Sequence, residues 1–196
     1  MAELHVCRRE LIVGGQKSGK SVRAECLARE WLQADASHLA ILLATAQPWD
    51  DEMRERIARH QQARAQRVPG MRTLEEPVAV AQTLSKHSNA QTFIEVDCLT
   101  LWLTNWMMPM SDLAQPETAC ARQTPPVDAL CEALLQLPGP VVIVSNEIGL
   151  GVIPMGAQVR AFVDALGVLN QRVASVCERV TLMAAGLPLV LKEQTT

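Results

Sequence analysis

Short runs of consecutive apolar residues alternate along the chain with longer segments in which apolar residues recur at helical spacing. The apolar runs predict buried strands at residues 11–13, 39–44, 92–96 and 141–145, with a further short strand at 71–74. The periodic segments predict helices at residues 18–33, 50–67, 77–85, 99–108, 127–137 and 157–177. Two last runs, 180–184 and 187–191, flank Ala185-Gly186 and predict a terminal hairpin.

This order of elements predicts an α/β fold. Strands that are apolar throughout are typical of a mostly parallel sheet covered by helices on both faces. We find no internal repeat, and a chain of 196 residues suits one substantial domain, which we take to span residues 1–196. Residues 109–126 contain four prolines and predict a long surface loop.

Composition and charge limit the kinds of molecule that the protein is expected to bind. The net charge of −3, the absence of tyrosine and the presence of only two phenylalanines argue against nucleic acid as a partner. No apolar run approaches the ~20 residues of a membrane span. The six cysteines are scattered, mostly within apolar runs, and the segment 1–10 is too charged for a secretion signal, so we expect a reducing, cytoplasmic environment.

One motif carries specific chemistry. The segment GGQKSGKS, residues 14–21, fits G-x-x-x-x-G-K-[ST] at every fixed position, with an apolar strand before it and an amphipathic helix after it. Such a P-loop points backbone N–H groups at a nucleotide's phosphates. Its lysine contacts the β- and γ-phosphates, and its last hydroxyl ligates Mg²⁺. The predicted phosphate-binding residues are Gly14, Gly15, Gln16, Lys17, Ser18, Gly19, Lys20 and Ser21.

A P-loop also needs a carboxylate near its metal ion, normally at the carboxyl end of a neighbouring strand. Asp97 follows the strand 92–96, and Glu147 follows the strand 141–145. Each also has the simpler interpretation of a loop or helix-capping acid. We favour Asp97, with Ser21, as the metal-binding pair.

Several further blocks, in order and at similar spacing, resemble one enzyme family. They are ATAQ at 44–47, DDEMRERIARH at 50–60, RTLEE at 72–76, VDCLTLWLTN at 96–105, SNEIGLGVIP at 145–154 and NQRVA at 170–174. Together with the P-loop they make the chain, from about Leu11 to Lys192, similar to the bifunctional adenosylcobinamide kinases / adenosylcobinamide-phosphate guanylyltransferases of cobalamin biosynthesis. The segment 61–71 is longer than the family's usual link.

The resemblance implies two reactions on a corrinoid in a RecA-like P-loop fold that assembles as a homotrimer. A nucleoside triphosphate, ATP or GTP, phosphorylates adenosylcobinamide; GTP then guanylylates a histidine, which passes GMP to adenosylcobinamide phosphate. The family's histidine corresponds to His60, and its catalytic P-loop lysine to Lys20. Its remaining nucleotide contacts correspond to Thr45, Ala46, Gln47, Gln61, Gln62, Ala63, Arg64, Glu75 and Asp97.

The residues themselves leave simpler interpretations open. Neutral imidazole is a competent nucleophile near pH 7, but a histidine at the end of an arginine-rich helix also suits a solvated or capping position. The arginines of residues 54–64 suit a solvated helix face paired with Glu52 and Glu55. Trp102 and Trp106 suit core or interface packing. A different small-molecule P-loop kinase, and less readily a RecA-type motor, therefore remain alternatives at this point.

Overall fold

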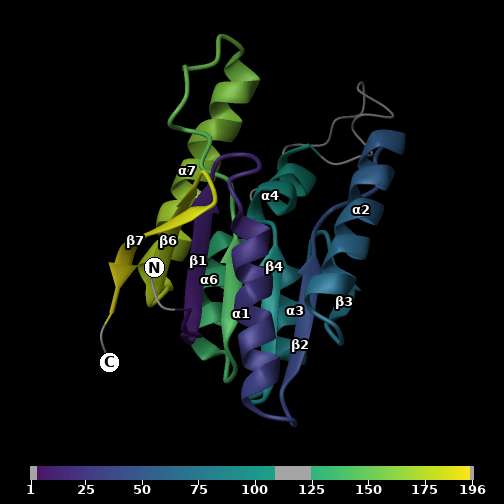
Figure 1. The fold of residues 1–196 in the computed structure, drawn as a ribbon. Coiled ribbons are helices and arrows are strands. Elements are labelled where there is room, and N and C mark those ends of the chain that lie inside the picture. The colour runs from purple at the N-terminus through teal and green to yellow at the C-terminus, as the bar shows by residue number, and fades with distance from the viewer. Residues whose placement is uncertain (1–3, 109–124, 195–196) are drawn as a thin grey trace.

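The computed structural model describes residues 4–108 and 125–194, and its ribbon is shown in Figure 1. The described strands are β1 (Arg9–Gly14), β2 (Leu39–Ala44), β3 (Arg72–Glu75), β4 (Thr92–Asp97), β5 (Val141–Val144), β6 (Arg179–Ala184) and β7 (Leu187–Glu193). The described helices are α1 (Lys20–Ala34), α2 (Asp51–Arg67), α3 (Val80–His87), α4 (Leu99–Met107), α6 (Val127–Gln136) and α7 (Ala157–Val176). Most of the loop predicted at 109–126 lies outside the described residues.

All seven strands belong to one sheet in the order β3-β2-β4-β5-β1-β6-β7. Every pairing is parallel except β6 with β7. These two strands form the predicted hairpin around Ala185 and Gly186, whose φ angles of 51° and 80° suit a two-residue hairpin turn. The predicted fold, a mostly parallel P-loop sheet with a C-terminal hairpin, is confirmed.

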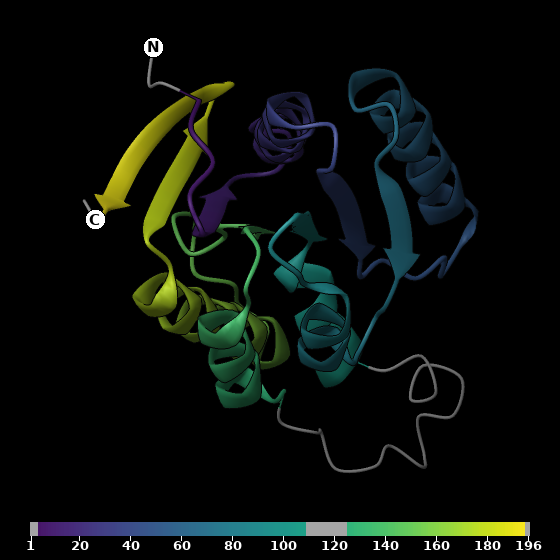
Figure 2. The same cartoon turned by 90° about the horizontal axis from the view of Figure 1, so that it is seen from below.

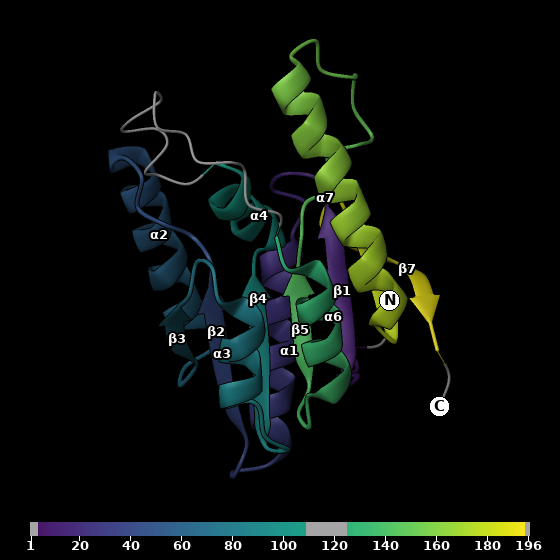
Figure 3. The same cartoon turned by 180° about the vertical axis from the view of Figure 1, so that it is seen from behind.

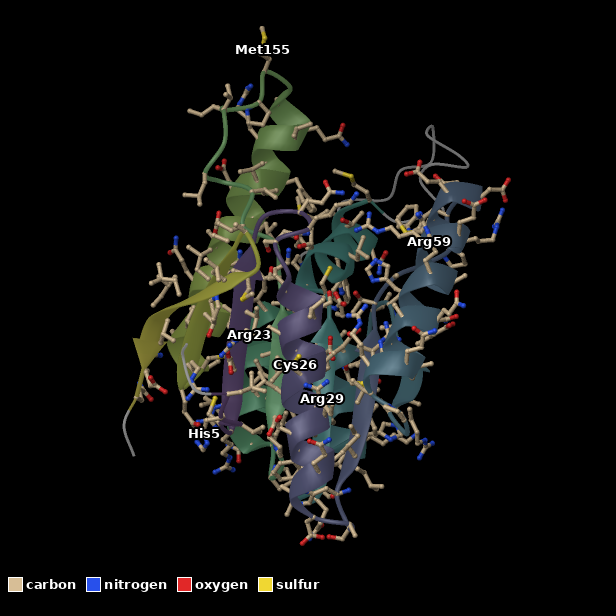
Figure 4. The ribbon with its side chains drawn as sticks, in the orientation of Figure 1. His5, Arg23, Cys26, Arg29, Arg59 and Met155 are labelled. Carbon is tan, nitrogen blue, oxygen red and sulfur yellow. The ribbon has the colours of Figure 1, made fainter. Side chains whose placement is uncertain are left out.

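Helices cover both faces of the sheet. Viewed along the strands, α1 and α2 lie on one face, and α3, α4, α6 and α7 lie on the other (Figure 2). The view from behind shows that α7 extends beyond the edge at which the parallel strands end (Figure 3). The loop residue Met155 lies at the far end of this projection (Figure 4). The carboxyl ends of the parallel strands therefore lie on the side of the sheet from which α7 projects.

Successive side chains of each strand point to opposite faces of the sheet and belong to two separate hydrophobic cores. On one face, residues such as Leu11, Ile94 and Ile143 pack against the helices α3, α4, α6 and α7. On the other face, Ile12 and Phe93 pack against α1. This period-two alternation explains why the inner strands are apolar at nearly every position, since each side chain meets a helix layer.

The structure corrects one local prediction and confirms another. The helix expected at 77–85 begins at Val80, because the Glu76 carboxylate accepts the N–H groups of Val78 and Ala79 at 3.0 and 2.7 Å and holds this segment in a turn. Trp102 is 1% exposed and belongs to the larger core, and Trp106 packs against that core. The core interpretation of both tryptophans is therefore confirmed.

No helix in the described part of the chain is long and apolar enough to cross a membrane. The five described cysteines are free thiols, and Cys98, Cys131 and Cys177 are buried. Burial raises the pKa of the Cys98 thiol to about 11 and that of Cys177 to about 12. These thiols are therefore un-ionised at neutral pH and act as small apolar side chains.

Gly139, just before β5, tests how tightly this fold is packed. A Cβ atom there would lie 2.1 Å from the carbonyl oxygen of Asn89 and 2.6 Å from that of Thr92. Both obstacles are backbone, so we expect Gly139→Ala to lower the free energy of unfolding by about 1–3 kcal/mol. Gly167 in α7 has open space around it, and Gly167→Ala should raise stability by roughly 0.5–1 kcal/mol. Urea unfolding of both variants measures the two changes in the free energy of unfolding. Equal changes would contradict the prediction.

Candidate nucleotide-binding and transfer site

The segment between β1 and α1 adopts a conformation that favours glycine at two positions. Gly14 and Gly19 have φ angles of 153° and 101°, and a Cβ on Gly14 would lie 2.4 Å from the carbonyl oxygen of Met183. Lys17 also has a positive φ of 57°. The loop is supported from behind by β6 and β7, because the N–H of Gly186 donates to the Ser18 carbonyl oxygen at 3.0 Å.

The N-terminus of α1 opens into this loop. Its N-cap is Gly19, and no side chain caps the helix. The first N–H groups of the helix are therefore free to bind an anion, which the helix dipole also favours. The residues Gln16, Lys17, Ser18, Gly19, Lys20 and Ser21 line a cavity of about 470 Å³ at this point. Gly14 and Gly15 form the backbone of the loop behind it.

Lys20 lies in the wall of this cavity with its ammonium group folded onto the loop. Its Nζ donates to the carbonyl oxygens of Gly14 and Gly15 at 3.0 and 2.7 Å. Burial lowers the pKa of the Lys20 ammonium. A group held this way is placed to exchange loop carbonyls for phosphate oxygens when a nucleotide enters.

The side chain of Ser21, at the start of α1, is hydrogen-bonded to that of Asp97, at the end of β4. The Ser21 hydroxyl donates to Asp97 Oδ2 at 2.9 Å, which brings an α1 residue and a residue at the end of β4 together. Glu147 also lies next to the loop, since its N–H donates to the Gly14 carbonyl oxygen, but its Oε1 accepts the N–H of Gly149 at 2.9 Å. Hard oxygen donors suit Mg²⁺, and the Ser21–Asp97 pair can supply two of them.

A second cavity, of about 280 Å³, lies between the strand ends and α2 and contains His60 in its wall. The helix begins with the Asp50 carboxylate accepting the Met53 N–H at 2.7 Å, as a capping aspartate does. Partial burial lowers the pKa of His60, and nearby arginines lower it further against the opposing effect of Asp97. The imidazole is therefore neutral at pH 7 and retains a free electron pair.

The two cavities adjoin. Both are lined by Met53 and Arg56 of α2, by Leu101 of α4 and by Asp97. The phosphate-binding loop and His60 therefore face a common space, with Asp97 at the boundary. This shared wall is the geometric basis for assigning one site to both sets of residues.

The remaining predicted contacts divide into two groups. Ala46, Gln61, Arg64 and Glu75 line the cavity that contains His60. Gln47, Gln62 and Ala63 do not line either cavity.

Thr45 lies behind the site. It is fully buried, and its hydroxyl donates to the Cys98 carbonyl oxygen at 2.7 Å and accepts the Cys98 N–H at 2.8 Å. Its own N–H donates to the Asp97 carbonyl oxygen at 3.1 Å. In this conformation Thr45 braces the backbone that carries Asp97.

Sequence reasoning underestimated the arginines of α2. Arg56 lines both cavities, although it was expected on a solvated helix face. The sequence feature that could have indicated this is its place in the 50–60 block, four residues before His60. Arg54 pairs with Asp51 at 2.7 Å, not with Glu52 or Glu55. Arg64 is buried and faces Glu25 of α1, a carboxylate that no motif had marked.

Glu95 was also missed. It is 1% exposed, two residues before Asp97 on β4, and neither carboxyl oxygen has a hydrogen-bond partner. Burial raises the pKa of Glu95 well above its ordinary range, and the adjacent Asp97 and Glu25 add to that effect. Burial therefore favours the protonated form of this carboxyl group.

Fold and loop together define a P-loop nucleotide-binding protein of the α/β class. Comparison with known proteins makes this specific: residues 10–191 match the model of the family described as cobinamide kinase / cobinamide phosphate guanyltransferase. The chain belongs to this family, which assigns it both activities, and the resemblance predicted from the sequence blocks is confirmed.

Characterised relatives agree. The chain is 48% identical to a bifunctional adenosylcobalamin biosynthesis protein, CobP, of Pseudomonas aeruginosa, over 94% of this chain and 97% of that protein. It is 30% identical to CobU, of the same description, from Escherichia coli, and 31% identical to CobU from Salmonella typhimurium. Those two alignments each cover 93% of this chain and 98% of the relative.

Proposed function

We propose that this protein carries out both reactions at the joined cavities, with His60 as the covalent carrier of GMP. The observation that carries the proposal is the shared wall of Met53, Arg56, Asp97 and Leu101, which places the P-loop and His60 on one space. A nucleotide whose β- and γ-phosphates are bound at the α1 N-terminus could thus present its α-phosphate toward α2. Family membership supplies the corrinoid substrate class.

In the kinase step, the substrate hydroxyl oxygen attacks the γ-phosphorus of ATP or GTP. The bond from γ-phosphorus to the bridging oxygen breaks, the hydroxyl proton is released, and the nucleoside diphosphate leaves. Lys20, freed from the loop carbonyls, and the α1 amides bind the phosphate oxygens. Catalysis of this kind rests on positioning and on charge stabilisation.

In the guanylyl step, an imidazole nitrogen of His60 attacks the α-phosphorus of GTP and pyrophosphate leaves. A phosphate oxygen of adenosylcobinamide phosphate then attacks the same phosphorus, the P–N bond breaks, and adenosylcobinamide-GDP forms. The covalent intermediate divides one difficult displacement into two easier ones. Arg56 and Arg64, both in the cavity walls, are placed to bind the phosphate oxygens.

Ser21 and Asp97 would hold Mg²⁺, since their oxygens already lie within hydrogen-bonding distance at the mouth of the loop. When bound, the ion supplies charge neutralisation on the phosphates. The apolar part of the second cavity, with Leu42 and Ile57 in its wall, suits a nucleobase. Glu75 in the same wall can accept the two adjacent N–H groups of guanine, which adenine lacks.

The larger assembly is also proposed. Val152, Ile153 and Met155, on the projecting loop before α7, are at least 78% exposed, and an exposed apolar group of this kind suits contact with another subunit. The exposed residues support contact between subunits, and the number of three comes from the family resemblance alone. Dependence on ATP and GTP suits a cytoplasmic location.

Covalent labelling of His60 tests the proposed function. We expect incubation with GTP labelled at the α-phosphate to leave acid-labile, base-stable label on the protein, because a phosphoramidate hydrolyses in acid. His60→Ala should abolish the label while still binding GTP. His87→Ala, outside the site, is the matched control and should label normally. Absence of label from the unaltered protein would contradict His60 as the covalent carrier of GMP.

The pH dependence of labelling follows from the lowered pKa of His60. Only neutral imidazole attacks, so the rate should be constant above the pKa and fall about tenfold per pH unit below it. Because burial and the arginines lower this pKa, the fall should be centred below the ordinary value of about 6.5. Single-turnover labelling between pH 5 and 8, with circular dichroism to confirm folding, makes the measurement; a midpoint above that value would contradict the assignment.

Two substitutions test whether Asp97 or Glu147 contributes to Mg²⁺ binding. Asp97→Asn removes the charged partner of Ser21 and should weaken Mg²⁺-dependent nucleotide binding on the order of 10- to 100-fold. Glu147→Gln should leave that affinity nearly unchanged, because the Glu147 carboxylate already accepts the Gly149 N–H. Calorimetric titration of GTP with and without Mg²⁺ checks both variants. The reverse ranking would assign the metal to Glu147.

A further inference from the structure

Helix α2, which carries His60, is attached to the rest of the molecule in an unusual way. Of its 17 residues only Arg64 is buried. By comparison, α1 buries six side chains, among them Ala24, Leu27 and Ala28 of the second core. Apolar burial therefore fixes α1 along its length, whereas α2 has a buried apolar side chain only at its C-cap, Val68, which belongs to the second core.

What α2 has instead is an ion-pair cluster with α1. Glu25 of α1 is 3% exposed, and Arg67 Nη1 donates to its Oε2. Arg64 Nε lies 3.6 Å from Glu25 Oε1. One buried carboxylate thus faces two guanidinium groups that are three residues apart on α2.

The spacing relates this cluster to the proposed nucleophile. His60 precedes Arg64 by four residues, so His60, Arg64 and Arg67 lie along one side of α2. Arg64 lines the cavity together with His60, whereas Arg67 does not. Arg67 can therefore stay paired with Glu25 while Arg64 also serves the nucleotide.

Glu25 is also linked to the phosphate-binding loop, because both belong to or adjoin helix α1. The helix that holds it begins at Lys20, so one rigid element carries the phosphate-binding lysine at its start and this carboxylate just over one turn later. An ion pair buried between two helices is costly to break, because removal of one partner leaves the other charge without compensation. The pairing thus ties the orientation of α2 to the element that binds the phosphates.

We propose that Glu25 is a positioning residue for guanylyl transfer: through Arg67 and Arg64 it holds α2 so that His60 faces the nucleotide bound at the α1 N-terminus. The inference rests on the proposed function of His60. It assigns Glu25 no contact with substrate. Its effect is on the geometry of attack, so its loss should reduce the rate of the chemical step and not the affinity of the P-loop.

The test is the single-turnover rate of His60 labelling at saturating GTP. Glu25→Gln keeps the shape of the side chain and removes its charge, and we expect the rate to fall roughly 10- to 100-fold, as small misplacements of a reacting group do. The dissociation constant for GTP should change by less than about threefold, within the range of a surface substitution. Arg67→Gln, at a partly exposed position, should lower the rate in the same direction with less risk to folding. The double variant should be no slower than the slower single variant, because both remove the same interaction.

Glu10→Gln is the matched control. Glu10 is a fully buried carboxylate on β1 that pairs with Arg23 of α1 at 3.2 Å and with Arg179 of β6 at 3.6 Å. Its loss also disrupts a buried ion pair of α1, but one that does not involve α2. We expect its labelling rate to stay within about twofold of the unaltered protein. An equal loss of rate in Glu10→Gln and Glu25→Gln, or an unchanged rate in Glu25→Gln, would overturn the proposal.

Hydrogen exchange distinguishes this inference from the function on which it rests. Amides of α2 should exchange faster in Glu25→Gln than in the unaltered protein, while those of β4 stay protected, and Glu10→Gln should leave α2 unaffected. If the unaltered protein takes no label, the proposed function fails. If α2 exchange is the same in Glu25→Gln, the anchoring role fails whatever the labelling shows.

Discussion

The uncapped N-terminus of α1 is the feature on which the rest of the site depends. Free N–H groups at a helix start are costly unless something binds them, and here Gly19 leaves them open to the cavity. The loop before them requires glycine at two positions and is supported from behind by Met183 and Gly186. Lys20, Ser21 and Asp97 are then arranged around this one anion-binding point.

The two helices on that face of the sheet are held by different forces, and the difference matches their roles. Helix α1 is fixed by apolar packing and presents the part of the site that must be ready before a ligand arrives. Helix α2 is tied to α1 by charge, through Arg64 and Arg67, and carries His60, the nucleophile that we propose. A buried ion pair contributes little net stability, because the cost of desolvating both charges offsets their attraction.

Most of the fold could be predicted from the sequence because the inner strands are buried on both sides and therefore apolar at nearly every position. The hairpin was signalled by Ala185-Gly186, and the phosphate loop by its fixed glycines and lysine. The start of α3 was missed, because the capping role of Glu76 depends on a turn whose signal, a proline, also suits the first position of a helix.

The site was predictable only where a motif has a fixed chemical role. Glu25 and Glu95 could not be recognised, since a buried carboxylate in a helix or strand looks like any surface acid until its neighbours are placed. The same applies to Thr45, which the family pattern marks for the nucleotide and which here braces the backbone of Cys98. Spacing along the chain predicts which residues share a face, but not which buried polar groups meet across elements.

The support of the phosphate loop by β6 and β7 has a consequence for biosynthesis of the chain. Strand β1 pairs only with β5 and β6, and the carbonyl of Ser18 is bonded to Gly186, so every partner of the first strand is made more than 120 residues after it. On the ribosome, β1 therefore stays unpaired until β5 has emerged, and the loop 14–21 lacks its bond to Gly186 until the hairpin has emerged. A nascent chain arrested before residue 141 would expose this apolar strand with neither of its partner strands made, which favours its recognition by chaperones.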